Sequence, residues 1–121
     1  MSTIGYKHYM FIDGDLPGNG DDMELPGHEA LIITNKNDKD AHIIANIYFE
    51  DKDPVKGIHI TVPKERVICI RTDLPFGEEN YQVPFGQFSL ELESDIEVCA
   101  CYGRLDRRHN LGYYVTGSCC K

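Results

Sequence analysis

The chain has 121 residues and a formal net charge of −8, from 20 acidic and 12 basic residues, and 41% of its residues are hydrophobic. This length suits one compact domain, so we expect a single unit over residues 1–121. The hydrophobic content is typical of a globular chain and not of a disordered one. An acidic field repels phosphate backbones and anionic lipid headgroups, which disfavours nucleic acid as the main ligand.

The N-terminal segment MSTIGYKHYMFID lacks the charged, apolar and small-residue parts of a secretory signal, and no run reaches transmembrane length. We therefore expect a cytoplasmic protein whose five cysteines stay reduced. Cys99 and Cys101 would point to the same face of a strand, too far apart for a comfortable disulfide. Because paired CxxC knuckles are missing, we expect no structural metal and interpret the cysteines as small buried or interface thiols.

Apolar and polar residues alternate along much of the chain, and no stretch keeps a helical period. In chain order, the expected strands cover residues 7–13, 29–35, 41–50, 57–63, 66–71, 86–93, 96–102 and 112–118. Segments rich in Gly, Pro, Asn and Asp separate them, including a turn at 93–95 and long loops at 14–27 and 73–86. About eight short antiparallel strands predict an all-β, single-domain β-sandwich or jelly-roll-like fold.

Two of the expected strands differ in their pattern. In residues 41–50, Ile43, Ala45 and Ile47 would face the core, whereas His42 and its alternate neighbours would face the other way. The segment RVICIR at 66–71 is apolar on both faces. That pattern fits either a central strand of the sandwich or a strand buried in an oligomer.

Candidate chemistry concentrates in two places. His28 and Glu29 stand where a long loop enters a strand, and they form either site residues or a local hydrogen-bonding pair. In RLDRRHN, Arg104 and Asp106 can form an internal salt bridge or reach together toward a ligand. The basic residues of this segment suffice for one small anion but not for duplex nucleic acid. Acidic doublets such as Glu78–Glu79 are interpreted as solvated turns.

No nucleophile motif, HExxH or HxH spacing, P-loop or dinucleotide fingerprint occurs in the sequence, so we expect no catalytic residue, no metal and no cofactor. The segments GHEALIITN, DAHIIANIYFEDKDPV, ITVPKERVICIRTDL and SDIEVCACYGRLDRR, in this order, make the chain resemble the sensory rhodopsin transducer family. The resemblance covers most of the chain. It implies a β-sandwich subunit of a homotetramer and a family regarded as binding small molecules, sugars or related metabolites, without catalysis.

The same resemblance implies a set of polar residues around a ligand pocket, which bind by hydrogen bonds and charge. They are Asp13, His28, Glu29, His42, Arg71, Arg104, Asp106 and Arg108. A membrane photoreceptor is an expected partner only where the same genome encodes one.

The leading hypothesis is thus a cytoplasmic ligand-binding or signal-transducing module. One alternative is an enzyme acting on a carbohydrate-like metabolite, with Asp106 or Glu29 as general base and Arg104 as charge stabiliser. Another is a structural interaction protein that buries Arg104 and Asp106 between subunits.

Overall fold

A computed structural model of the chain describes residues 4–16, 28–105, 114–116 and 119–121. Its strands are β1 (Tyr6–Leu16), β2 (His28–Asn35), β3 (Ala41–Phe49), β4 (Val55–Val62), β5 (Arg66–Arg71), β6 (Gly86–Leu105), β7 (Tyr114–Thr116) and β8 (Cys119–Cys120). The predicted all-β fold is confirmed. In the described part of the chain, no helix is long and apolar enough to span a membrane.

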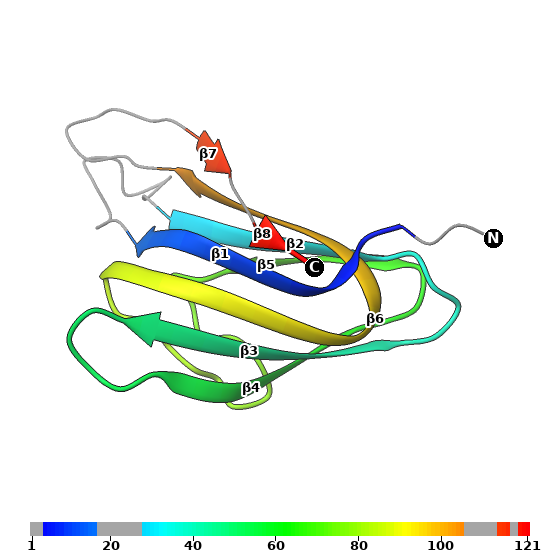
Figure 1. Cartoon of the computed structure of the whole chain (residues 1–121), viewed down its shortest axis with the longest axis horizontal. Helices are drawn as coiled ribbons and strands as arrows, with labels where there is room; N and C mark the ends of the chain where they lie inside the picture. The colour runs from blue at the N-terminus through cyan, green and yellow to red at the C-terminus, as the bar shows by residue number, and fades with distance from the viewer. Residues whose placement is uncertain (1–3, 17–27, 106–113, 117–118) are drawn as a thin grey trace.

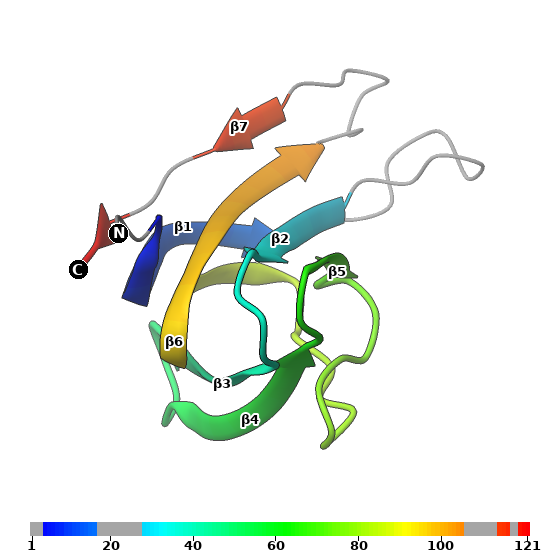
Figure 2. The same ribbon diagram turned by 90° about the vertical axis from the view of Figure 1, so that its right-hand side faces the viewer.

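Strand β6 joins two antiparallel sheets into one sandwich-like body. Its first half lies between β1 and β3, and its second half lies between β2 and β7. The first sheet has the order β4-β3-β6-β1-β8, and β5 extends the second sheet beyond β2. In Figures 1 and 2, β6 bends sharply and carries the chain from one sheet to the other.

The bend in β6 corrects one expectation. The sequence predicted two strands separated by a turn at 93–95, but the structure has a single strand of 20 residues. The polar groups at the bend are bonded: Ser94 Oγ donates to Ile96 O at 2.7 Å, and Asp95 Oδ1 accepts from His42 N at 2.9 Å. Strands that switch sheets through such bends form the corners of β-sandwiches.

Strand β5 corrects a second expectation. Within the described residues it pairs with β2 alone, so it is an edge strand and not a central one. Ile68 and Ile70 pack against the core, whereas Val67 is 61% exposed. The described residues of one subunit therefore do not explain why both faces of β5 are apolar. Burial in an oligomer, the other interpretation of RVICIR, stays a prediction.

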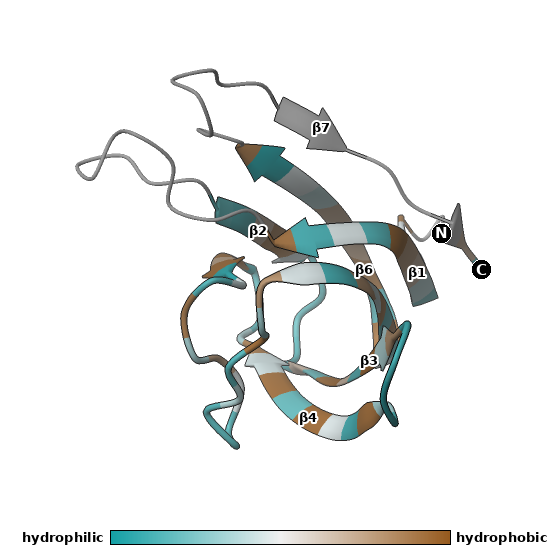
Figure 3. Cartoon of the chain, turned by 90° about the vertical axis from the view of Figure 1, so that its left-hand side faces the viewer, coloured by the Kyte–Doolittle hydropathy of each residue, from teal (hydrophilic) through white to brown (hydrophobic). Residues whose placement is uncertain are grey.

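Period-two alternation produces the core between the sheets. Figure 3 shows hydrophobic and hydrophilic bands alternating along β4. Large side chains that are almost completely buried include Phe11, Leu31, Ile33, Ile43 and Leu90. Burying a side chain of this size contributes about 1.5–3 kcal/mol. The core therefore supplies most of the driving force and leaves the alternate positions free to carry polar groups.

The loop between β5 and β6 covers part of this core. Phe76 and Val83 are buried in it, and the backbone of Phe76 pairs with that of Tyr81 through hydrogen bonds of 2.9 and 3.1 Å. The same loop places Glu78 and Glu79 beside β4, where Glu78 N donates to His59 O.

Candidate functional site

Three of the predicted site residues meet at the end of the sandwich where β1 and β6 end and β2 begins. Glu29 and Arg104 are direct partners in the β2–β6 ladder. Arg104 Nε donates to Glu29 Oε2 at 2.6 Å, and its Nη2 donates to Asp13 O at 3.1 Å and Asp13 Oδ1 at 3.3 Å. Arg104 is 8% exposed and Glu29 has no exposure, so this is a buried ion pair.

The Glu29 carboxylate accepts further hydrogen bonds from groups that the sequence did not single out. Tyr102 OH donates to Oε1 at 2.6 Å, and Asp15 N lies 3.0 Å from Oε2 and 3.2 Å from Oε1. Thr72 Oγ1 is 2.9 Å from Tyr102 OH and thereby extends the cluster to the segment after β5. A buried carboxylate is tolerated when charge and hydrogen bonds compensate its desolvation, and here both are present.

Tyr102 acts in this cluster as a hydrogen-bond donor. Burial raises the pKa of its phenol far above the usual range, and the neighbouring Glu29 carboxylate raises it further. The phenol therefore keeps its proton and donates to Glu29 at every physiological pH. The i, i+2 spacing of Tyr102 and Arg104 on one strand was the sequence signal that both side chains point to the same side.

The other predicted residues lie elsewhere. Arg71 pairs with Asp73, with Nε to Oδ1 at 3.0 Å and Nη2 to Oδ2 at 2.5 Å, and the hydrogen bond to Asp73 raises the pKa of its guanidinium. His28 begins β2 opposite Leu105 in the ladder, one position from Glu29 and hence on the other face of the strand. Asp106 and Arg108 lie outside the described residues.

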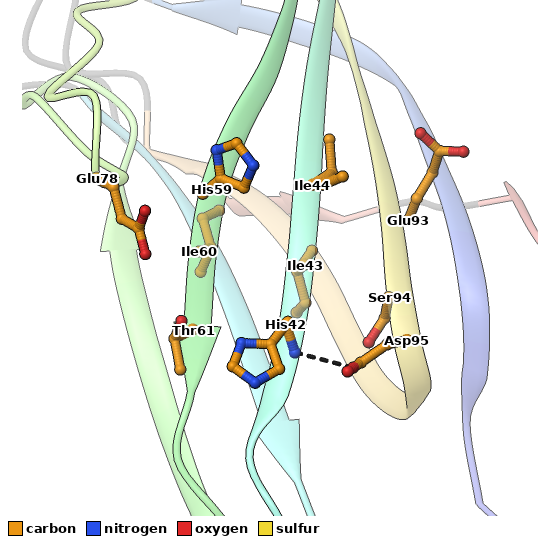
Figure 4. A pocket seen from close by; sticks show the side chains of 10 residues that line it. All are labelled: His42, Ile43, Ile44, His59, Ile60, Thr61, Glu78, Glu93, Ser94 and Asp95. Carbon is orange, nitrogen blue, oxygen red and sulfur yellow. Dashed lines mark hydrogen bonds between the residues drawn. The ribbon is translucent and has the colours of Figure 1, made fainter.

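His42 belongs to a different place, a groove of about 400 Å³ on the outer face of β3, β4 and β6. Figure 4 shows two imidazoles, three carboxylates and the exposed aliphatic side chain of Ile44 around it. The lining residues are His42, Ile43, Ile44, His59, Ile60, Thr61, Glu78, Glu93, Ser94 and Asp95. None of these ten described residues is Lys or Arg, and the three carboxylates make the field of the groove acidic.

The rim of the groove carries a hydrogen-bonded pair. His59 Nδ1 lies 2.6 Å from Glu79 Oε2, and His59 N donates to Glu79 Oε1 at 2.8 Å. The hydrogen bond and the charge of Glu79 raise the pKa of His59, and the hydrogen bonds from His59 lower the pKa of Glu79. Ligand atoms of His59, Glu78 and Glu79 all lie within 4.8 Å of one another, a spacing compatible with a divalent cation. All three residues are exposed.

A polar network continues from the groove across the outer face of the same sheet. Asn46 Nδ2 donates at 3.0 Å to both Glu91 Oε1 and Glu93 Oε2, and Tyr48 OH donates to Glu91 Oε1 at 2.9 Å. Burial raises the pKa of Glu91, but hydrogen bonds from His8, Asn46 and Tyr48 outweigh it and lower the pKa. Alternation along β3 had placed Asn46 and Tyr48 on the face opposite the core, which was the available signal for this network.

These features define a small all-β protein of the sandwich type, with a fully bonded buried ion pair at one end and an acidic groove on an outer face. The chain matches the family described as Anabaena sensory rhodopsin transducer over residues 4–119, and it belongs to that family. The resemblance inferred from the sequence is thereby confirmed.

Solved structures agree with this assignment. The chain is similar to the crystal structure of Thermotoga maritima 1070, with 26% identity, a TM-score of 0.81, and coverage of 96% of this chain and 94% of that one. It is also similar to the Anabaena sensory rhodopsin transducer, with 30% identity, a TM-score of 0.73, and coverage of 87% of this chain and 92% of that one. A comparison with curated proteins gave no match.

Proposed function

We propose that the protein is a non-catalytic, cytoplasmic signal-transducing module that binds a neutral polyhydroxyl molecule, such as a sugar, in the groove around His42. The groove is the observation that carries this proposal. Its volume of about 400 Å³ lies in the range of small-molecule sites, roughly 300–1,000 Å³. Carboxylates accept hydrogen bonds from neighbouring hydroxyls, and the exposed side chain of Ile44 offers an apolar contact for the C–H face of a sugar ring.

The charge of the groove selects among ligand classes. Glu78, Glu93 and Asp95 line it, and none of the ten described lining residues is Lys or Arg, so a sugar acid or a nucleotide would meet like charge there. The arginine that the sequence offered for an anion, Arg104, is bound instead to Glu29 and Asp13. A neutral polyol therefore fits better than an anion.

The geometry of Glu29 counts against the enzyme hypothesis. A general base needs an accessible lone pair aimed at the substrate. Both Glu29 oxygens accept hydrogen bonds from protein groups, and the residue has no exposed surface. The other base considered, Asp106, lies outside the described residues.

Signalling by a binding module requires a partner that senses the bound state. We include a homotetramer in the proposal, as the family resemblance implies, because assembly lets ligand binding at one subunit influence another. A membrane photoreceptor is a partner only where the same genome encodes one.

A thermal-shift screen of the purified protein tests the ligand proposal. The panel contains neutral sugars, sugar alcohols, sugar acids and nucleotides, with wild type and Glu93→Gln measured side by side. A ligand present at about 100 times its Kd stabilises the native state by about 2.7 kcal/mol. For this chain length that raises Tm by about 10 °C. Glu97→Gln, four residues along the same strand and outside the groove, is the matched control.

A neutral polyol should raise the Tm of wild type and of Glu97→Gln, and raise that of Glu93→Gln much less. No shift with any neutral polyol would overturn the proposal, and so would an equal shift in the Glu93→Gln variant.

A further inference from the structure

The acidic doublet Glu78–Glu79 lies against an imidazole in the folded chain. The doublet belongs to the loop between β5 and β6, and the fold places it beside His59 of β4. Ligand atoms of the three side chains lie within 4.8 Å of one another and combine one imidazole nitrogen with two carboxylates. The sequence predicted no metal because 20 positions separate His59 from Glu79, whereas metal motifs are recognised by short spacings.

The loop that carries the doublet is fixed to β4. Glu78 N donates to His59 O at 2.9 Å, and His59 N donates to Glu79 Oε1 at 2.8 Å. Gly77, at φ +77°, packs so closely on Ile58 that a Cβ at this position would clash with it. Because the chain is held at these points, the two carboxylates and the imidazole are already gathered. Binding an ion between them therefore costs little ordering of the backbone.

The negative charge of this cluster is not balanced by described residues. Glu79 Oε2 lies 2.6 Å from His59 Nδ1, but the Glu78 carboxylate accepts no hydrogen bond from a described residue. Two carboxylates at this spacing repel each other, and a cation between them removes the repulsion. The net charge of −8 and the carboxylates of Glu93 and Asp95 in the adjoining groove also raise the local concentration of cations.

We infer that His59, Glu78 and Glu79 bind one divalent transition-metal ion with the ligand preferences of Mn²⁺ or Zn²⁺, at the rim of the groove. The imidazole selects against Mg²⁺ and Ca²⁺, which take oxygen ligands. Ligand atoms on one such ion lie about 3.0 Å apart when adjacent and about 4.2 Å apart when opposite. The widest pair here therefore closes by less than about 2 Å, which exposed side chains achieve by rotation about their own bonds.

Three protein ligands leave coordination positions of the ion open to water. His59 and Glu78 also line the groove, and Figure 4 shows them on the side opposite Glu93 and Asp95. The ion thus adjoins the place proposed for the polyol, but it is held by protein groups alone. The inference goes beyond the proposed function for this reason, and failure of either one leaves the other intact.

A titration of the untagged, chelator-treated full chain with Mn²⁺ tests the inference. Free aqueous Mn²⁺ gives a sharp six-line electron paramagnetic resonance signal that is lost on binding. Mn²⁺ also prefers oxygen to sulfur, which matters in a chain with five cysteines. The test variants are Glu79→Gln and His59→Gln. Glu93→Gln and His42→Gln are the matched controls, because they remove the same groups from the same groove outside the three ligands.

We expect wild type to bind one Mn²⁺ per chain in a saturable manner. Glu79→Gln and His59→Gln should each weaken binding at least tenfold, since loss of a group that only orients a ligand already costs about 10–100-fold. The two controls should weaken it less than about threefold at physiological salt, because they change only a screened field. Excess Mg²⁺ should displace little Mn²⁺. Far-UV circular dichroism verifies that each variant is folded.

Three results would each overturn the inference. Mn²⁺ that stays free in the presence of wild type would show that the cluster is a solvated turn. Equal weakening by Glu93→Gln and Glu79→Gln would show that the acidic field of the whole groove, and not a coordination site, attracts the ion. Binding that His59→Gln leaves unchanged, or that Mg²⁺ replaces as readily as Mn²⁺, would show that the imidazole is not a ligand.

Discussion

Replacing Arg104 with methionine removes the charge from the buried cluster while keeping a long side chain in its place. Glu29 then remains without exposure and keeps only its hydrogen bonds from Tyr102 and Asp15 N. Removing one partner of a buried pair costs about 3–5 kcal/mol, because the remaining charge is left uncompensated. With an unfolding entropy of about 2.1 cal/mol/K per residue, this loss lowers Tm by roughly 12–20 °C.

Urea unfolding followed by far-UV circular dichroism measures this loss, since the chain has no tryptophan. Asp13→Asn is the matched control: the Asp13 side chain is 64% exposed and lies 3.3 Å from Arg104 Nη2. A contact of this exposure contributes less than about 1 kcal/mol. The double variant Glu29→Gln with Arg104→Met should lose less stability than the sum of its two single variants, by about 2 kcal/mol, because the two residues are in contact.

A different result would refute the structural interpretation of this ion pair. If Arg104→Met unfolded at the same urea concentration as Asp13→Asn and lost only ligand binding, Arg104 would be a ligand-binding group. The alternative that the sequence left open, an arginine reaching out of the fold, would then be correct.

Two further predictions concern the groove and its loop. Folding raises the pKa of His59 above its ordinary value of 6.5 and lowers the pKa of Glu79 below its ordinary value of 4.5. The stability that their pair contributes is therefore fully present only between pH 4.5 and pH 6.5. This stability is lost as the pH rises through the folded pKa of His59 or falls through the folded pKa of Glu79. An NMR titration should give His59 a pKa above 6.5 in wild type and a lower pKa in Glu79→Gln. Equal His59 pKa values in wild type and Glu79→Gln would contradict the pairing. Gly77→Ala should destabilise the protein by about 2–3 kcal/mol, because φ is +77° and the new Cβ would clash with Ile58 Cγ2. Gly57→Ala, at φ +83° with nothing within 4 Å, should cost only about 1 kcal/mol in the same urea experiment, and equal losses would show that the contact with Ile58 is relieved at no cost.

The fold could be predicted from the sequence to the extent that it depends on alternation. Ile43, Ala45 and Ile47 face the core as their spacing indicates, and all three are almost completely buried. The fusion of two expected strands into β6 was missed because the polar residues at 93–95 have the composition of a turn. Ser94 Oγ instead donates to Ile96 O within the bent strand, and Asp95 Oδ1 accepts from His42 N of β3. Composition cannot distinguish these two uses of the same residues.

The candidate site was less accessible to sequence reasoning because it depends on pairing between distant strands. Glu29 and Arg104 were singled out separately, and only the β2–β6 register makes them partners. His42 entered through the family resemblance and lies in the groove, but His59 and Glu93 join it only because β4 and β6 flank β3. Ligand binding stays a prediction for all eight residues: Asp13, His28, Glu29, His42, Arg71, Arg104, Asp106 and Arg108.

The central position of β6 determines when this chain can fold during synthesis. Strand β1 pairs only with β6 and β8 among the described strands, and its first residue in the ladder, Tyr6, is paired with Val98. Until residues 86–98 have left the ribosome, β1 therefore waits with both edges unpaired. The hairpin of β3 and β4 can form earlier, since its strands are adjacent in sequence. Nascent chains with such open edges aggregate readily, and folding that depends on distant pairs is slow. Production of this protein should accordingly depend on chaperones that shield β1 until β6 has emerged.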